Sequence, residues 1–460
     1  MQPPLSAMDA SDDPIRPDEL GGLFARLTAD MPCALAVSGG CDSTALMVLL
    51  ADWLCQQGQD AARHTVLTVD HGLRADSAAE ARSVAAAAAG LGYRHATLVW
   101  EGAKPLTGIQ AAARSARYRL MGDYMRTHGI DLLFTAHTRD DQAETLLMRL
   151  ARGSGLDGLC AMAPVAPLGE YGLGGTEAHG VRLIARPLLD VPKARLRATL
   201  RARGIAWIED PANAAPQFER SRLRAARAQL DGLGLTDDML ALSAARLLRV
   251  RRALDRVVER FCDPDAGTVG VDPCGMIAID RKELRQAGEE IVLRVLHGAI
   301  AAAGGSEQPV PLGKLEAIVA AICDGVPIPG RWTLARALVT ASEPTVVIER
   351  EPGREPLPEL TLAPGTTVLW DGRFRVSVAP DFSGGPVQVR ALGDVELTDL
   401  RRRGAIAAGA PARAAGMAPS VWHGGELIAV PPLRYWKAPH SCGAIEAIFV
   451  GIGKLKRNAR

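Results

Sequence analysis

The fold is decided by one stretch of the sequence, Ala34-Leu35-Ala36-Val37-Ser38-Gly39-Gly40-Cys41-Asp42-Ser43. Its first four residues are apolar and of strand length, two glycines follow, and a helix-forming stretch then runs to Gln57. Adjacent glycines let the backbone approach an anion closely, and the first turn of a helix offers free N–H groups with a favourable dipole. The stretch therefore predicts a phosphate-binding loop between a strand and a helix. An ordinary capping turn is the alternative, because serine and aspartate also cap helices.

The loop also predicts a cation. It is not a Walker loop, because the ending Gly-Lys-Ser/Thr is absent and no lysine follows. Asp42 stands where the phosphates would bind, and its carboxylate would repel them unless a cation intervenes. We therefore expect Asp42 to hold Mg²⁺. The residues expected to contact the phosphates are Ser38, Gly39, Gly40, Cys41, Asp42 and Ser43.

Around the loop, from about residue 25 to 150, short apolar strands alternate with longer helical stretches. The expected strands are Ala34–Val37, Thr65–Asp70, Ala96–Trp100 and Leu132–Ala136, and the expected helices are Ser43–Gln57, Ser77–Leu91, Ile109–His128 and Asp141–Arg152. Such alternation is typical of an α/β fold with a parallel sheet, whose ligands bind at the carboxyl ends of the strands. Three of the strands run into Ser38, Asp70 and His137, so a site is predicted at this edge.

A second motif, His-Thr-Arg-Asp-Asp-Gln-Ala-Glu-Thr, begins with His137 at the end of the fourth strand. Asp141 and Glu144 are three residues apart, so they share a helix face that starts at the edge of the sheet. The acids of this motif suit a capping role at the helix N-terminus. They equally suit the ammonium of an incoming amine, or a second metal ion.

These motifs resemble those of a known family. The Ser38–Ser43 loop resembles the pyrophosphate-binding loop of the N-type ATP pyrophosphatase (PP-loop) superfamily, which holds the β- and γ-phosphates of ATP while the α-phosphate is attacked. The string HTRDDQAETLLMRLARGSGLDGL from His137 resembles the signature of the tRNA(Ile)-lysidine synthases. The resemblance is dense over about residues 30 to 230 and thinner beyond. Thr138 and Ser221 depart from the residues usual in the family, so their roles stay open.

The resemblance implies a ligase that works in two steps. ATP with Mg²⁺ adenylates the C2 oxygen of the wobble cytidine in the CAU anticodon of tRNA(Ile). The ε-amine of free L-lysine then displaces AMP, which gives lysidine and changes the codon read from AUG to AUA. The implied catalytic residues are Asp42, His137, Asp141 and Glu144, and which acid accepts the proton of lysine is left open. The implied ATP contacts outside the loop are Asp70, His71 and Arg114; a strand-end turn is the alternative for the first two.

Charge is uneven along the chain. The net charge is only +1, but residues 182–227 hold 11 Arg or Lys against 4 Asp or Glu. Such an excess is typical of a phosphate-binding surface, although a solvated helix face would look the same. Because blocks that resemble the family fall in this stretch, we expect Arg220, Arg222 and Arg224 to bind tRNA.

At 460 residues the chain is too long for one ordinary domain. The sequence predicts a disordered leader over 1–25, a Rossmann-like catalytic domain over 26–230, a mainly helical tRNA-binding domain over 231–350 and a small α+β domain over 360–460. No apolar run approaches the roughly 18 residues of a membrane span, and no export signal is present, so a cytoplasmic protein without membrane contact is predicted. Whether it forms a homodimer is left open.

Three rival functions share part of this pattern. A PP-loop tRNA thiolase shares the adenylation step but needs paired cysteines or an iron–sulfur cluster, and the 8 cysteines of this chain show no C-x-x-C spacing. An amidotransferase like GMP synthetase would need a glutaminase domain or ammonia channel, and the sequence suggests neither. A tRNA-binding protein with a decayed nucleotide site is disfavoured because Ser38, Asp42, Asp141 and Glu144 are intact.

Overall fold

The computed structural model describes residues 12–24, 31–72, 76–102, 104–105, 107–168, 182–209, 219–306, 310–323, 330–353, 356–437 and 443–451. Its contacts divide the described residues into two compact units, one that ends at Arg251 and one that starts at Arg252. Among the described residues, no helix is both long and apolar enough to cross a membrane.

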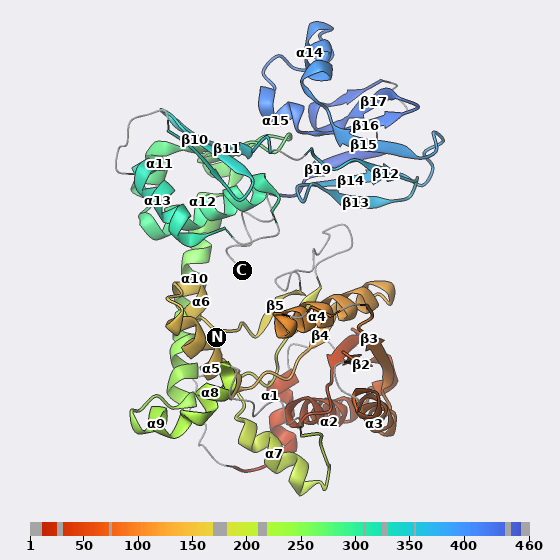
Figure 1. Cartoon of the computed structure of the whole chain (residues 1–460), viewed down its shortest axis with the longest axis vertical. Helices are drawn as coiled ribbons and strands as arrows, with labels where there is room; N and C mark the ends of the chain where they lie inside the picture. Colours follow the sequence, from red (N-terminus) through yellow and green to blue (C-terminus); the bar gives the residue numbers. More distant parts are fainter. Residues whose placement is uncertain are drawn as a thin grey trace. The chain divides into compact units, whose positions relative to one another are not determined.

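The first unit is built on a six-stranded sheet with the order β3-β2-β1-β4-β6-β5 (Figure 1). The strands are β1 (Cys33–Ala36), β2 (Thr65–Asp70), β3 (Arg94–Val99), β4 (Leu132–Phe134), β5 (Val165–Pro167) and β6 (Leu183–Ala185). All neighbours pair in parallel except β5, which pairs antiparallel with β6. The strand order reverses between β1 and β4, and ligands of such sheets bind at this switch point. The predicted parallel sheet is confirmed.

Helices cover both faces of this sheet because successive side chains of a strand point to opposite sides. Cys33 and Leu35 of β1 face a core formed with one group of helices, whereas Ala34 faces α4 (Ile109–Thr127). The first group is α1 (Leu20–Phe24), α2 (Cys41–Gln56), α3 (Ser77–Gly90) and α7 (Lys193–Ala202), opposite α4 in Figure 1. The expected strands and helices lie within two residues of the observed ones.

A second group of helices is gathered around α5. They are α5 (Arg139–Ala151), α6 (Leu156–Leu159), α8 (Glu219–Ala225), α9 (Arg227–Gly232) and α10 (Asp237–Phe261). Ala143 and Leu146 of α5 pack against Leu240 and Ala244 of α10 in a small apolar core. The first turn of α10 is thereby brought to the first turn of α5, where the predicted acids lie.

The N-terminal residues correct one prediction, the disordered leader expected over 1–25. Residues 1–11 lie outside the described part, but Pro17–Glu19 and α1 are helical. Ile15, Leu20 and Phe24 are buried in the core of the first unit, and Arg195 Nη2 donates to Glu19 at 2.8 Å. The burial of these three apolar side chains explains why the end of the expected disordered leader is ordered.

The second unit contains strands where the sequence analysis expected mainly helix. Its first sheet is antiparallel, in the order β7-β8-β11-β10-β9. The strands are β7 (Val269–Val271), β8 (Ile277–Asp280), β9 (Gly330–Leu334), β10 (Ala337–Ala341) and β11 (Thr345–Arg350). Helices α11 (Arg281–Gln286), α12 (Glu289–Gly304) and α13 (Leu312–Cys323) pack with it. The Ala- and Leu-rich sequence predicted these helices but not the strands between them.

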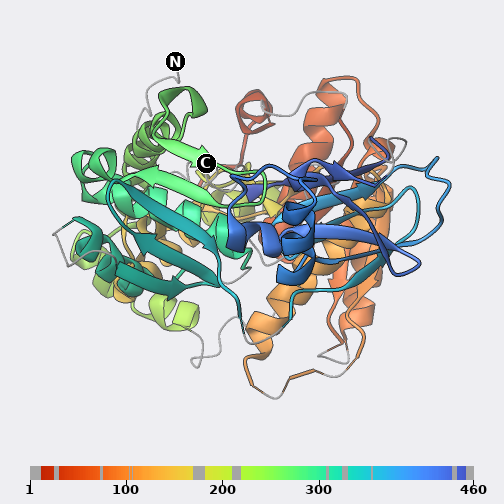
Figure 2. The same ribbon diagram turned by 90° about the horizontal axis from the view of Figure 1, so that it is seen from above.

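The C-terminal part holds two more antiparallel sheets, β12-β15-β16-β17-β18 and β13-β14-β19. Their strands are β12 (Leu360–Leu362), β13 (Thr367–Trp370), β14 (Phe374–Val378), β15 (Val387–Ala391), β16 (Pro419–His423), β17 (Glu426–Val430), β18 (Tyr435–Trp436) and β19 (Ile445–Phe449), with helices α14 (Asp394–Arg402) and α15 (Ala412–Gly416). One continuous core joins them to the β7–β11 sheet, and Figures 1 and 2 show the sheets next to each other. The fully buried Asp371 pairs with Arg336 and Arg350 of that sheet.

Candidate active site

The predicted phosphate loop is a preformed turn between β1 and α2. Gly39 has a φ of +83°, in the left-handed region that favours glycine. Its carbonyl accepts the N–H of Ile208 at 2.9 Å, and a Cβ on Gly39 would lie 2.5 Å from Ile208 Cδ1. Gly40 precedes the first turn of α2, so the free N–H groups of that turn face the loop. This geometry is that of an anion cradle.

The two loop serines shape the turn. The backbone N–H of Ser38 donates to Ser43 Oγ at 3.2 Å, and Ser43 Oγ donates to the Gly40 carbonyl at 3.1 Å. The two hydroxyls lie 3.3 Å apart. Cys41 is buried beside them, and burial raises the pKa of its thiol to about 11, so it stays a neutral thiol at physiological pH. These hydrogen bonds hold the loop in its shape.

We expect Gly39→Ala to damage the loop. A left-handed alanine costs about 1–2 kcal/mol, and the added methyl also meets Ile208. Stability should fall by that amount, and the KM for ATP should rise. Gly58→Ala is the matched control. Gly58 follows the C-terminal end of α2, has a φ of +66°, and has no atom within 4 Å of the position that a Cβ would take. It should lose similar stability in thermal unfolding and keep the KM for ATP. An unchanged KM in Gly39→Ala would show that the loop does not hold ATP.

Asp42 is half-buried rather than in an exposed turn. Its Oδ2 accepts from Lys193 Nζ at 2.7 Å, whereas its Oδ1 has no hydrogen-bond partner among the described residues. Burial raises the pKa of Asp42, against the lowering effect of Lys193. A buried carboxylate oxygen without a partner fits a bound cation, and Mg²⁺ needs few protein ligands because phosphate and water supply the rest. No group of three or more acidic, histidine or cysteine side chains able to hold a metal occurs in the described part of the chain.

Lys193 was missed by the sequence analysis. It is the first residue of α7, and its backbone N–H donates to Asp140 Oδ2 at 2.9 Å while its side chain reaches Asp42. A positive charge in the first turn of a helix is unfavourable, because that end of the helix dipole is also positive. A lysine at this position therefore indicates a role other than helix stability. Through Lys193, the phosphate loop and the start of α5 are joined into one site.

Thr138 and Asp141 form a capping box at the start of α5. The N–H of Thr138 donates to Asp141 Oδ2 at 2.9 Å, and the N–H of Asp141 donates to Thr138 Oγ1 at 3.4 Å. Burial would raise the pKa of Asp141, but His137, the Thr138 amide and Arg220 outweigh it and lower that pKa. The capping role is therefore present, and it leaves Asp141 Oδ1 to face Arg220 at 3.4 Å.

Glu144 lies one turn further along α5, and its side chain is only 5% exposed. Arg224 of α8 binds it through two bonds, Nε to Oε1 at 2.6 Å and Nη2 to Oε2 at 3.2 Å. Arg220 Nε lies 3.7 Å from Oε2. Two of the arginines predicted to bind tRNA thus contact the predicted catalytic acids. Arg222, between them in sequence, is exposed and forms no ion pair within the described residues.

His137 lies at the end of β4, and its Nδ1 is 3.0 Å from Thr135 Oγ1. Burial lowers the pKa of His137 to about 3, against the opposing charge of Asp141. The imidazole is therefore neutral at physiological pH. It can exchange a hydrogen bond with a substrate but supplies neither a positive charge for phosphates nor an effective base.

This pKa predicts a pH effect on stability. Between pH 6.5 and about 3, the unfolded chain protonates this histidine while the folded chain does not, so the folding stability falls as pH falls through that window. His137→Gln should flatten the slope of unfolding free energy against pH by at most about 1.4 kcal/mol per pH unit. Denaturant titrations of the wild type and the variant from pH 7 to 4 test this, and equal slopes in the two proteins would contradict it.

The residues predicted for adenosine lie at the end of β2 and in the second turn of α4. Asp70 Oδ1 accepts the N–H of Gly72 at 2.8 Å, so the alternative strand-end turn exists. His71 Nε2 is 3.3 Å from Arg117 Nη2, and burial, then Arg117, lowers the pKa of His71 to about 4. The Arg114 guanidinium lies over the Tyr118 ring, 5.3 Å from its centroid. Asp70 and His71 thus lie one strand away from the phosphate loop, because β2 is the neighbour of β1 in the sheet.

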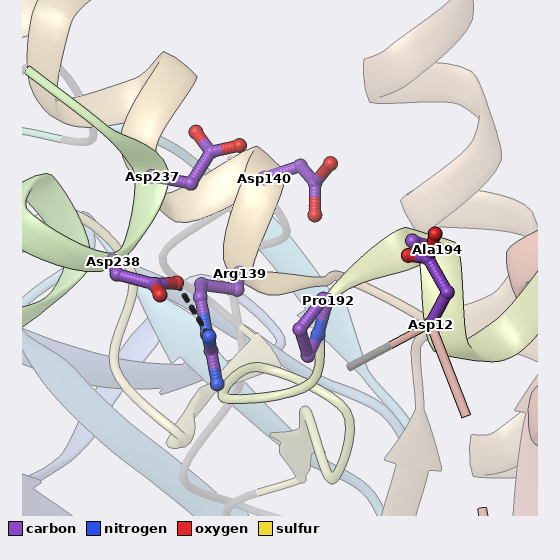
Figure 3. Close-up of a pocket in the computed structure, with 7 residues that line it drawn as sticks. All are labelled: Asp12, Arg139, Asp140, Pro192, Ala194, Asp237 and Asp238. Atoms are coloured by element: carbon purple, nitrogen blue, oxygen red, sulfur yellow. Dashed lines mark hydrogen bonds and ion pairs between the residues drawn. The ribbon is translucent and has the colours of Figure 1, made fainter. Parts of the chain in front are cut away.

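Two cavities adjoin the acids. The larger has a volume of about 240 Å³ and is lined by Thr138, Asp140, Asp141, Glu144, Lys193, Arg197, Arg224, Arg227 and Asp237. Its mixed charges suit a small zwitterion. Figure 3 shows the second, of about 180 Å³, where Asp140, Asp237 and Asp238 gather near Arg139, which bonds Asp238. The sequence analysis missed the lining residues from α7, α9 and α10, which lie far along the chain.

A phosphate loop without the Walker lysine, at the switch point of a parallel sheet, defines the class of PP-loop enzymes that use ATP. The sequence model of a family described as a PP-loop domain matches residues 19–229 of this chain. The predicted use of ATP is thereby confirmed.

Three curated relatives specify the family, and each is named tRNA(Ile)-lysidine synthase. The protein from Bradyrhizobium diazoefficiens is 44% identical over 81% of this chain and 96% of its own length. That from Rhodopseudomonas palustris is 43% identical over 72% and 94%, and that from Brucella suis biovar 1 is 35% identical over 86% and 85%. The chain belongs to the tRNA(Ile)-lysidine synthase family, as the motifs predicted, and is an ATP-using ligase of that family.

Proposed function

We propose that this chain joins L-lysine to C2 of the wobble cytidine in the CAU anticodon of tRNA(Ile) and converts ATP to AMP and pyrophosphate. The observation that carries the proposal is the pair of contacts made by Lys193, to Asp42 of the phosphate loop and to Asp140 of the acidic helix. These contacts bring the phosphate loop and the start of α5 together, which supports a single site for an adenylation step and an amine step. The family relatives favour lysidine formation over the thiolase alternative.

In the adenylation step, the Ser38–Ser43 loop binds the phosphates through the free N–H groups at the start of α2. Asp42 would hold Mg²⁺, which would supply positive charge to neutralise the phosphates. Lys193 holds Asp42 in place and adds a positive charge beside the reacting phosphate. Preorganised charges of this kind stabilise the transition state of the attack by the cytidine oxygen.

In the lysine step, Asp141 and Glu144 bind the ε-ammonium and one acid takes a proton from it. The amine must be neutral when it attacks C2, so a base is needed beside it. The neutral His137 is a poor candidate because its pKa is lowered to about 3. The acids Asp42, Asp141 and Glu144 are the candidates, and by the same argument Asp141, whose pKa is also lowered, is a weaker base than Asp42, whose pKa is raised. Asp141 is also bound to Thr138, which fixes its orientation toward the site.

The cytidine must leave its stack to reach these groups, so the target is the single-stranded anticodon loop. Arg222 and its neighbours on α8 supply positive charge for the phosphates of that loop. The proposed place of action is the cytoplasm.

Two measurements test the function. Pyrophosphate release from ATP should require tRNA(Ile) with a CAU anticodon, and mass spectrometry of the tRNA should show a gain that corresponds to lysine minus water. Each of the other amino acids, tested singly, should give no product. A product in which sulfur replaces oxygen, or a reaction indifferent to lysine, would overturn the proposal.

A further inference from the structure

The acids proposed for lysine bind cations that belong to the chain itself. Arg224 binds both oxygens of Glu144, at 2.6 and 3.2 Å, and Arg220 lies between Glu144 and Asp141, at 3.7 and 3.4 Å. Both arginines come from the short helix α8, four residues apart and therefore on one face of it. A guanidinium carries the same charge as the ammonium of lysine, so the place for the substrate is occupied.

Glu144 cannot simply release its partner. Its side chain is 5% exposed, and a buried carboxylate without a cation is strongly unfavourable. Lysine therefore binds by exchange, in which its ammonium replaces the Arg224 guanidinium. The guanidinium needs a new partner at the same time, because it cannot lose its proton.

The exposure of the arginines indicates what that partner is. The side chains of Arg220 and Arg224 are 38% and 43% exposed, so each side chain remains partly open to solvent while its guanidinium binds the acids. Arginine binds phosphate in the same two-bonded manner as carboxylate. A phosphate of the anticodon loop, as it approaches the site, offers the two arginines an equivalent partner.

We propose that Arg220 and Arg224 keep the lysine site filled until the tRNA backbone draws them away, so that tRNA binding opens the site for lysine. The proposal rests on the proposed function, because it takes tRNA and lysine as the two ligands. Coupling between two ligands is reciprocal: if tRNA tightens lysine binding, lysine tightens tRNA binding by the same factor. The arginines act as positioning residues, and the arrangement makes the chain bind its substrates in order.

The test is calorimetric titration of L-lysine into the full chain at pH 8 without ATP, so that no turnover occurs. With wild-type protein, tRNA(Ile) should tighten lysine binding at least about fivefold. In the double variant Arg220→Met with Arg224→Met, lysine should bind at least about fivefold more tightly than to wild type without tRNA, and tRNA should add little. Arg126→Met is the control, since Arg126 is an exposed arginine of α4 whose partner is Asp123, at 3.1 Å. It should leave lysine affinity without tRNA unchanged.

Lysine affinity that is equal or weaker in the double variant, or that ignores tRNA in the wild type, would overturn the proposal. Thermal unfolding checks that the variants are folded. Should the double variant be unfolded, Arg224→Lys keeps the charge but loses the two-bonded contact, and it should bind lysine more tightly than wild type does without tRNA. Lysidine formation by the wild type is assayed in parallel. If lysidine forms but the coupling is missing, only this proposal fails; if no lysidine forms, the proposed function fails.

Discussion

Asp42→Asn is expected to reduce tRNA-dependent pyrophosphate release about 100-fold or more, because it removes a charge that acts where the phosphates react. Asparagine has the same shape, but it cannot hold Mg²⁺ as a carboxylate does, and it leaves Lys193 without its ion pair. The fold should persist, since burial already disfavours the charged form of Asp42. The initial rate of pyrophosphate release, measured over a range of Mg²⁺ concentrations, is the readout.

Asp52→Asn is the matched control for this prediction. Asp52 lies on the same helix, α2, and pairs with Arg203 at 2.5 Å, but both side chains are about a third exposed. A surface ion pair of this kind contributes about 1 kcal/mol or less. Its loss should leave pyrophosphate release intact. A near wild-type rate in Asp42→Asn, with the same Mg²⁺ dependence, would show that this carboxylate does not hold the metal.

The sequence predicted the catalytic sheet well because its signals are local. The strands expected at Thr65–Asp70 and the helices expected after the loop depend on short apolar runs and on glycine turns, and they were found within two residues. The acids at the start of α5 could be placed near the loop because parallel strands carry their loops to one edge.

The partners of the acids could not be predicted in the same way. Arg224 meets Glu144 across 80 positions, and Lys193 meets Asp42 across 151. No pattern in a single sequence indicates which arginine of a basic stretch contacts a buried acid. Arg220 and Arg224 were therefore expected to bind tRNA, and their contacts with the acids of α5 were not predicted. The dipole argument at Lys193 was the one local signal available, and it was overlooked.

The second unit shows a different limit. Short strands such as β10 and β11 alternate buried and partly exposed residues, but they follow Ala- and Leu-rich helices that dominate the composition of the stretch. The contacts that join the first sheet to the C-terminal sheets are also long-range. The ion pair of Arg336 with Asp371 is one of them, and its buried carboxylate sits in a turn that no motif marks.

Asp141→Asn and Glu144→Gln are expected to lower lysine incorporation about 100-fold or more, the size of a lost acid–base contribution, and to lower adenylation much less. We expect this difference because the two steps use different residues of the site. Asp42 and Lys193 serve the phosphates, whereas Glu144 is buried against arginines of α8 and makes no contact with the phosphate loop among the described residues. Asparagine at 141 keeps an oxygen for the Thr138 amide, so the cap of α5 should survive, unlike in Asp141→Ala, where loss of a cap costs about 1 kcal/mol. Adenylated tRNA should then accumulate in the presence of lysine, visible by mass spectrometry as an added AMP.

A general loss of stability must be separated from this effect. Asp255→Asn is the control, because it too breaks a buried pair of an acid with an arginine, Asp255 with Arg294 at 3.2 Å, in the second unit. It should lower the melting temperature but keep the ratio of lysidine to adenylated tRNA, whereas the two site variants should shift that ratio toward adenylated tRNA at any temperature where they are folded. If both activities fell together in Asp141→Asn and Glu144→Gln, these acids would belong to the adenylation step as well, and the assignment of the amine site to α5 would be wrong. A selective loss of the second step would instead leave one of these carboxylates as the group that takes the proton from lysine.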